Sequence, residues 1–426
     1  MKKAVLSALV LLSALSLNAK TWTPKDILDI IYKVNNTWQQ THPRHERAFW
    51  DPAVYHTGNM EAYQLLKNQA WYDYSKAWAE HNEWMGAKEP DATKWEYKQY
   101  GEGQQYVLFG DWQICFQTYI DLYMLRQEGA SQGGCCTREK GKDHGECAPV
   151  APDENCKMIK RALEVMRHEA HSDANDYWWW ADALYMVMPV MTKMYLLTGD
   201  RAYLDKMYDN WQYANSIMYD AETGLYFRDG KYVYPRHQTA SGRKDFWARG
   251  DGWVVAAFAK VLKDLPKDDQ HRKTYLKYYK KMVKAVADCQ QPEGYWTRSM
   301  LDAGQAPGRE TSGTALFAYG IQWGINNGVL PAKRYQPVVD RAFDYLATIA
   351  LQPDGTVGYV QPIGEKAIPG QVVNQKSVTN FGTGAFLLAA CEYYRHVAAA
   401  YGTAETKKKH KGSGLFVSVG GNIGNF

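Results

Sequence analysis

Similar helix openings recur along this chain at intervals of about 60 to 70 residues, and this repeat constrains the fold more than any other feature. After each opening come an apolar helix, a short break, an amphipathic helix and a closing turn. A helix that is apolar on all sides is buried, whereas an amphipathic helix shows a polar face to water. The openings are Gly110-Asp111-Trp112, Ala181-Asp182-Ala183, Gly250-Asp251-Gly252, Ser312-Gly313-Thr314 and Phe381-Gly382-Thr383, with a weaker sixth at His56-Thr57-Gly58.

Six pairs of one buried and one half-exposed helix predict an all-α protein, an (α/α)6 barrel of six inner and six outer helices. All inner helices would begin at the same end of the barrel. Asp111, Asp182 and Asp251 would then occupy corresponding positions and converge on one cavity. An open helical solenoid shows similar pairing. Openings that are polar and aromatic favour the closed barrel.

The segments at the two ends of the chain differ from the barrel, which is predicted to be one domain over residues 20–403. Residues 1–19 have the pattern of a signal peptide, with two lysines before an apolar stretch. This pattern predicts export, with the periplasm as the expected compartment. No later run is long enough to span a bilayer, and no cysteine near the cut offers a lipid site, so no membrane anchor is expected. Residues 404–426 are predicted to be a loose tail.

An insertion at about residues 129–156 lacks apolar periodicity and holds four of the seven cysteines: Cys135, Cys136, Cys147 and Cys156. In an exported protein, at least one disulfide among them is the first expectation. A zinc site that includes His144 is the alternative, but the spacing fits no standard set of ligands. We therefore expect no metal.

Charge and aromatic content narrow the class of partner. The chain has 50 Lys and Arg against 46 Asp and Glu, a net charge of +4, which provides no basic field for nucleic acid. Its 16 tryptophans and 31 tyrosines are unusually many, and aromatic faces suit the rings of sugars.

Asp182 is the first candidate catalytic residue, because three tryptophans, Trp178 to Trp180, run directly into it at the start of an apolar helix. Burying a carboxylate without a partner is costly, so packing alone does not account for this acid. Apolar surroundings raise a carboxyl pKa and keep the proton available for transfer. The alternative is that Asp182 only caps the helix, since Asp is a favoured N-cap residue.

Several motifs together carry a resemblance to a known family. The strongest is Phe246-Trp247-Ala248-Arg249-Gly250-Asp251-Gly252-Trp253-Val254, which is similar to W-A-R-G-N-G-W-V. The others are Gly110-Asp111-Trp112-Gln113, Trp180-Ala181-Asp182, Glu310-Thr311-Ser312-Gly313-Thr314-Ala315 and Phe381-Gly382-Thr383-Gly384-Ala385-Phe386. Over most of residues 45–400 the chain resembles the unsaturated rhamnogalacturonyl hydrolases of glycoside hydrolase family 105, relatives of the family 88 unsaturated glucuronyl hydrolases.

This resemblance implies an (α/α)6 barrel without a metal or an organic cofactor. It also implies the substrate, an oligosaccharide that a lyase has left with a 4,5-unsaturated uronic acid at its non-reducing end. In such enzymes an acid protonates C4 and water adds at C5, and the resulting hemiketal opens and releases the next sugar. This reaction differs from displacement at the anomeric carbon by two carboxylates.

The same resemblance assigns roles at the helix openings. It implies that Asp182 is the proton donor and that Asp111 positions or tunes it, since two nearby carboxyl groups push their pKa values apart. Trp180 would supply the apolar wall that raises the pKa of Asp182. Arg249 would pair with a carboxylate of the site or with a substrate oxygen, unless it only forms an ion pair at the helix start.

Four further residues are candidates for substrate binding. Trp247 and Trp253 are predicted to stack on sugar rings, with core packing as the alternative for Trp253. His171 precedes Asp182 at the spacing where the family has a site histidine, and a surface histidine is the alternative. Asp251 stands where the family has Asn. We expect it to pair with the neighbouring arginine and to compete with a substrate carboxylate for that charge.

Two other classes of function remain open at this level. Inverting glycosidases, uronate lyases and sugar epimerases also use (α/α)6 barrels, and a fold does not fix a function. A non-catalytic glycan-binding protein would keep the aromatic residues but would not need Asp182. The sequence does not specify the uronate, the linked sugar or the oligomeric state.

Overall fold

The structure is a computed structural model that describes residues 20–132 and 152–412. Over these residues every regular element is helical, and extended segments meet only in isolated bridges. No described helix is long and apolar enough to cross a membrane. The predicted signal peptide and, in the insertion, His144, Cys135, Cys136 and Cys147 lie outside the described residues. Export and a disulfide therefore stay predictions.

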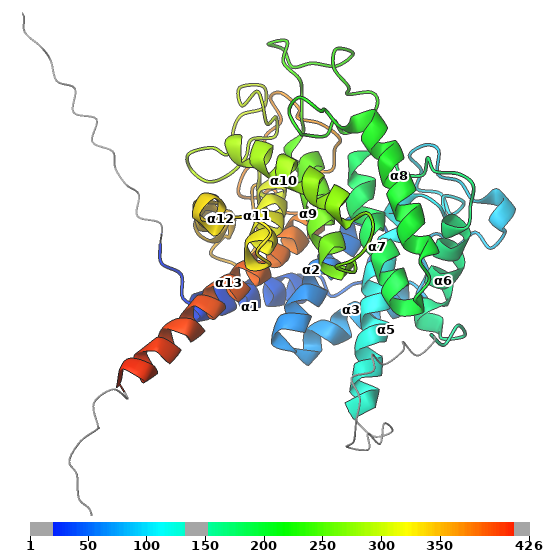
Figure 1. Cartoon of the computed structure of the whole chain (residues 1–426), viewed down its shortest axis with the longest axis horizontal. Coiled ribbons are helices and arrows are strands. Elements are labelled where there is room, and N and C mark those ends of the chain that lie inside the picture. Colours follow the sequence, from blue (N-terminus) through cyan, green and yellow to red (C-terminus); the bar gives the residue numbers. More distant parts are fainter. Residues whose placement is uncertain (1–19, 133–151, 413–426) are drawn as a thin grey trace, which may run out of the picture.

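Six inner helices form a closed ring in the described part of the chain (Figure 1). Each contacts the next and the last contacts the first, which is the closure that an open solenoid lacks. The predicted (α/α)6 barrel is thereby confirmed. In ring order the helices are α2 (Trp50–Leu66), α5 (Cys115–Gln132), α7 (Ala181–Thr198), α9 (Ala248–Asp264), α11 (Thr311–Asn326) and α13 (Asn380–Gly412), with the short α4 (Gly110–Gln113) leading into α5.

Six outer helices cover this ring. Each packs against the inner helix that precedes it, and α1 packs against α13. Their apolar residues lie on one side: α10 buries Tyr275, Tyr279 and Met282, whereas its lysines are exposed. The outer helices are α1 (Pro24–Thr41), α3 (Gln69–His81), α6 (Lys157–Ala170), α8 (Ala202–Met218), α10 (Arg272–Asp288) and α12 (Ala332–Tyr345), and the connections hold a 3-10 turn, η1 (Ala92–Lys94), and a π turn, η2 (Leu346–Ala350).

Some element boundaries differ from the sequence-based prediction. The helix expected to open at His56 begins at Trp50, because Pro52 lies in its first turn, where proline is tolerated. Helix α13 continues to Gly412, past residue 403, where the barrel was predicted to end. The predicted insertion at about residues 129–156 begins inside α5, which continues to Gln132, and it ends at Cys156, the N-cap residue of α6.

The closing segment after an outer helix crosses the start of an earlier inner helix, and three units repeat this contact. Each unit has a turn glycine with positive φ, at positions 224, 294 and 355. Four residues later, at positions 228, 298 and 359, a backbone carbonyl accepts a hydrogen bond from the first residue of an inner helix. The bonds run from Ala181 N to Arg228 O at 2.7 Å, from Ala248 N to Arg298 O at 2.9 Å and from Thr311 N to Tyr359 O at 2.9 Å.

This repeated bond fixes which inner-helix residues correspond. The residue after the bonded N–H is Asp182 in α7, Arg249 in α9 and Ser312 in α11. Asp251 lies two places beyond Arg249, and two places turn a side chain by about 200° around a helix. The predicted correspondence of Asp182 with Asp251 is therefore wrong.

Candidate active site

A cavity of about 210 Å³ opens at the end of the barrel where α2, α4 and α7 begin. Acids, an arginine and aromatic rings line it, which suits a polar ligand with apolar ring faces. The lining residues are Trp50, Tyr100, Asp111, Trp180, Asp182, Met186, Arg228, Ile363, Gly364 and Glu365.

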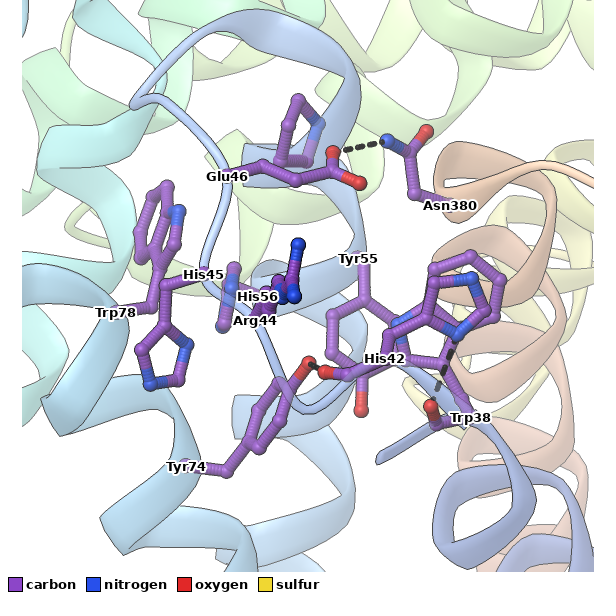
Figure 2. A pocket seen from close by; sticks show the side chains of 11 residues that line it. Trp38, His42, Arg44, His45, Glu46, Tyr55, His56, Tyr74, Trp78 and Asn380 are labelled. Atoms are coloured by element: carbon purple, nitrogen blue, oxygen red, sulfur yellow. Dashed lines mark hydrogen bonds between the residues drawn. The ribbon is translucent and has the colours of Figure 1, made fainter. Parts of the chain in front are cut away.

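A second pocket lies among α1, α2 and α3 and is rich in histidine (Figure 2). Its volume of about 20 Å³ is room for one water molecule rather than for a sugar ring. Arg44 and Glu46 line it, and Asn380 donates a hydrogen bond to Glu46 at 3.1 Å. The larger cavity is therefore the candidate active site.

Asp182 follows Ala181, the first residue of α7, and lines the cavity. Trp180 occupies the N-cap position, so the alternative role of Asp182 as the cap is wrong. Burial raises the pKa of Asp182, and the charges of Arg228 and Arg249 oppose this rise. Its Oδ2 has no hydrogen-bond partner among the described residues. Burial thus favours the protonated form of the Asp182 carboxyl group, beside a cavity in which a ligand can approach it.

Asp111 lies in α4 and lines the same cavity, so the structure brings Asp111 and Asp182 together as the sequence predicts. Burial raises the pKa of Asp111 well above its usual value, and the nearby charge of Asp182 raises it further. Two interacting carboxyl groups titrate as a pair, and the second proton is lost only at higher pH.

Arg228 is a candidate that the sequence analysis missed. Its Nε lies 3.4 Å from Asp182 Oδ2, and its Nη1 donates to Asp229 Oδ2 at 2.7 Å and to Glu365 Oε2 at 3.2 Å. Burial opposes its charge, but Asp182 and Asp229 hold the pKa of Arg228 above its ordinary value. The signal that would have found it is its place four residues after the turn glycine Gly224, where the closing segment meets α7.

Aromatic rings form the wall beside the two acids. Trp180 is 1% exposed, and its ring stacks on Phe109 with centroids 4.5 Å apart. Trp50 and Tyr100 line other parts of the cavity. The structure therefore places Trp180 where the sequence predicts an apolar wall for Asp182.

Arg249 is fully buried and does not line the cavity, so a contact with a substrate oxygen stays a prediction, while its charge lowers the pKa of the site carboxyl group Asp182. Its Nη1 donates to Gln361 O at 2.6 Å and its Nη2 to Pro362 O at 2.9 Å. These carbonyls belong to residues 361–366, here called the wall segment, because three of its residues line the cavity. Burial lowers the pKa of Arg249 to about 10. Arg249 positions the cavity wall.

Trp247 and Trp253 also lie outside the cavity lining, so their stacking on sugar rings stays a prediction that the cavity lining does not support. Trp247 donates from its Nε1 to Gln361 Oε1 at 2.8 Å, and its ring faces the Arg249 guanidinium at 4.6 Å. Trp253 is fully buried, with its ring 4.8 Å from that of Tyr185. Both tryptophans stabilise the barrel around the site.

Asp251 has a structural role. It is fully buried, and its Oδ1 accepts the N–H of Tyr226 at 2.9 Å. The next unit repeats this contact, where Thr314 Oγ1 accepts the N–H of Trp296 at 3.1 Å. Among the described residues, no ion pair joins Asp251 to Arg249, so the predicted competition with a substrate carboxylate is wrong. Asp251 fastens a closing segment to the start of α9.

Asp251→Asn should therefore leave KM and kcat unchanged. Burial raises the pKa of Asp251 well above its usual value and so favours the protonated carboxyl group, whose shape Asn reproduces. The folded protein holds this proton more tightly than the unfolded chain does, so the contribution of Asp251 to the free energy of unfolding falls as pH rises. The Asn variant has no such proton, and its free energy of unfolding should not fall for this reason. Asp251→Ala loses the bond and should lower the free energy of unfolding by about 1–3 kcal/mol. Urea unfolding and steady-state kinetics measure both effects, and a changed KM in the Asn variant would contradict this assignment.

His171 is the remaining predicted site residue, and the structure places it on the surface. It is the C-cap residue of α6, with 57% of its side chain exposed and its Nε2 3.7 Å from Asp200. It does not line the cavity. The surface position agrees with the alternative interpretation of His171, and its site role stays a prediction.

Two buried carboxyl groups with raised pKa values thus line one cavity at the mouth of the (α/α)6 barrel. The family profile described as Glycosyl Hydrolase Family 88 matches residues 25–133 and 153–397. The chain belongs to this family and is a glycoside hydrolase. The resemblance seen in the sequence motifs is thereby confirmed.

Two curated relatives are named unsaturated 3S-rhamnoglycuronyl hydrolase. The protein from Formosa agariphila is 36% identical over 252 residues, 56% of this chain and 66% of its own length. The protein from an Alteromonas species is 29% identical over 315 residues, 72% of this chain and 74% of its own length. The match thus spans just under two thirds of the first relative.

Solved structures give closer matches. A structure named glycosyl hydrolase family 88 from Bacteroides vulgatus is 53% identical with a TM-score of 0.80, covering 88% of this chain and 99% of that one. Another, named a polysaccharide lyase, is 58% identical with a TM-score of 0.80, covering 88% of this chain and 98% of that one.

Proposed function

We propose that this protein removes a 4,5-unsaturated uronic acid from the non-reducing end of lyase-generated oligosaccharides by hydrating the C4–C5 double bond. One observation carries the proposal: the buried acids Asp111 and Asp182, both with raised pKa values, share one cavity. Protonation of a carbon needs an acid that still holds its proton near neutral pH. Displacement at the anomeric carbon needs one carboxyl group to be ionised instead. The names of the curated relatives support the same reaction.

The reaction begins and ends with a proton on Asp182. Its carboxyl group gives this proton to C4, and the resulting carboxylate takes a proton from the water that adds at C5. The hemiketal at C5 then opens and the next sugar leaves, so that one water is consumed overall. Asp111 stays protonated, which keeps a second negative charge away from an anionic substrate.

The sugar next to the uronic acid is proposed to be a rhamnose that carries a 3-sulfate, in keeping with the names of the two curated relatives. Matched disaccharides in which the unsaturated uronic acid is linked to rhamnose, with and without the sulfate, test this choice. Release of rhamnose 3-sulfate from the sulfated substrate and of rhamnose from the other, measured by chromatography, should give a higher kcat/KM for the sulfated substrate. An equal or lower value would contradict the assignment of the linked sugar and leave the reaction itself intact.

A lyase is the second candidate, because a solved structure that is 58% identical carries that name. A lyase removes the C5 proton of a saturated uronide and creates the double bond. That step needs an ionised base near neutral pH, whereas burial raises the pKa of both Asp111 and Asp182. The raised pKa values of these two acids, which share one cavity, therefore support hydration.

Asp111→Asn should slow turnover, though less than the loss of Asp182, because Asn has the shape of the protonated acid but lacks its O–H. The alkaline limb of kcat/KM should also change. Two coupled ionisations in the wild type become a single one in the variant, so the limb becomes less steep. A pH series of kcat/KM measures this, and an unchanged rate and limb would show that the two acids do not act together.

A further inference from the structure

We propose, resting on the function above, that Arg228 is the residue that binds the carboxylate of the unsaturated uronic acid. Among the described residues lining the cavity, it is the only cation. The sequence motifs suggest Arg249 for this role, but its Nη1 and Nη2 donate to the carbonyls of Gln361 and Pro362. A substrate anion that enters this cavity therefore meets Arg228.

The edge of Arg228 that carries Nε and Nη2 makes no hydrogen bond to the described residues, although Nε forms an ion pair with Asp182 Oδ2 at 3.4 Å, and this edge has the right shape for a carboxylate. Its Nη1 is engaged by Asp229 and Glu365. Its Nε is buried without a hydrogen-bond partner, and its Nη2 makes no hydrogen bond to any described residue. The Nε and Nη2 hydrogens lie on one edge of the guanidinium, and such an edge binds a carboxylate through two parallel hydrogen bonds. A buried N–H donor without a partner costs free energy, so a ligand that accepts a hydrogen bond from it binds more tightly.

The position of this edge matches the chemistry of the sugar ring. The acid must reach C4, and the carboxylate is attached to C5, the neighbouring ring atom. The two protein groups must therefore lie side by side, and Arg228 Nε is 3.4 Å from Asp182 Oδ2. Glu365 holds the arginine from the other side and is itself fixed by hydrogen bonds from Tyr232 at 2.6 Å and Lys231 at 3.0 Å.

Binding at Arg228 has a consequence for Asp182. The charged groups around Asp182 are Asp111 from α4, Arg228 and Asp229 from the closing segment, Arg249 from α9 and Glu365 from the wall segment. In the free enzyme Arg228 favours the ionised form of Asp182. A substrate carboxylate bound to Arg228 neutralises the charge of the arginine and so raises the pKa of Asp182. The bound substrate thereby helps Asp182 to keep the proton that is later transferred to C4.

A comparison of two substrates in two enzymes tests the role of Arg228. The substrates are an unsaturated uronyl disaccharide and its methyl ester, which lacks the negative charge. Arg228→Gln should raise KM for the acid by about ten- to a hundredfold, the loss expected for hydrogen bonds to a charged group, and should change KM for the ester far less. Arg167→Gln is the matched control, because it removes an arginine that pairs with Glu154 on the surface, and neither residue lines the cavity.

Two further measurements keep the test decisive. Arg228→Lys keeps the charge beside buried Asp229 and should fold even where Arg228→Gln does not, yet it should still raise KM for the acid more than for the ester because the two-pronged edge is lost. In the wild type, the alkaline limb of kcat should lie at higher pH than that of kcat/KM, and this gap should close in Arg228→Gln.

The outcomes separate this inference from the proposed function. Equal effects of the arginine variants on acid and ester would overturn the role of Arg228, even with full activity of the wild type. A wild type that consumes neither unsaturated substrate would overturn the reaction itself.

Discussion

Asp182→Asn should fold like the wild type and lose two to four decades of turnover, the effect of removing a general acid that also serves as the base. The side chain is buried beside the cavity, and Asn fills the same space without a transferable proton. KM should change much less than kcat, because the substrate is held by other groups. Steady-state kinetics with an unsaturated disaccharide measure both constants.

Asp344→Asn is the matched control for this substitution. Burial also raises the pKa of Asp344, but this residue lies in α12 and bonds Trp22 at 2.7 Å, outside the cavity lining. It should therefore keep wild-type turnover. Near-normal turnover in Asp182→Asn would remove Asp182 from the mechanism.

Gly384→Ala should produce the largest loss of stability, because the ring closes where α13 meets α2 through backbone contacts. A Cβ atom at Gly384 would lie 2.4 Å from Val54 O and 2.7 Å from Tyr55 Cα. These are backbone atoms of a buried helix and cannot move aside like the end of a side chain. We expect a loss of about 3 kcal/mol or more in the free energy of unfolding, measured by urea denaturation.

Gly402→Ala supplies the control in the same helix. A Cβ atom there meets nothing within 4 Å, and alanine is the better helix former. This variant should be as stable as the wild type or gain up to about 1 kcal/mol. Equal stability of the two variants would mean that α2 and α13 do not approach each other as closely as the structure shows.

The barrel was predictable because its cause is local and repeated. Each apolar helix must be buried and each amphipathic helix must cover it, so the alternation along the chain specifies two concentric rings. That Asp111, Asp182 and Trp180 lie at one cavity was predictable from the same repeat, since residues at the start of inner helices meet at one end. The predicted starts and ends of the helices were less accurate, because the first and last turns of a helix depend on local contacts such as those around Pro52.

The remaining site residues depended on long-range register, which the motif pattern does not contain. Asp251 was aligned with Asp182 because the two sequence motifs are similar, but the hydrogen bond from the closing segment places Arg249 at the position that corresponds to Asp182. Arg228 and Glu365 reach the cavity from loops far apart in the sequence, and their pairing is a property of the folded chain. The four-residue spacing after the turn glycine Gly224 would have pointed to Arg228, but it would not have pointed to its partner Glu365.

The direction in which the ultraviolet absorbance of the C4–C5 double bond changes tests the proposed reaction most directly. With a lyase-generated unsaturated disaccharide, the wild type should lower this absorbance in step with release of the neighbouring sugar, and Asp182→Asn should not. With the saturated polysaccharide, the absorbance should stay constant. A rise in absorbance on the saturated polysaccharide, with no fall on the disaccharide, would contradict hydration and identify the protein as a lyase.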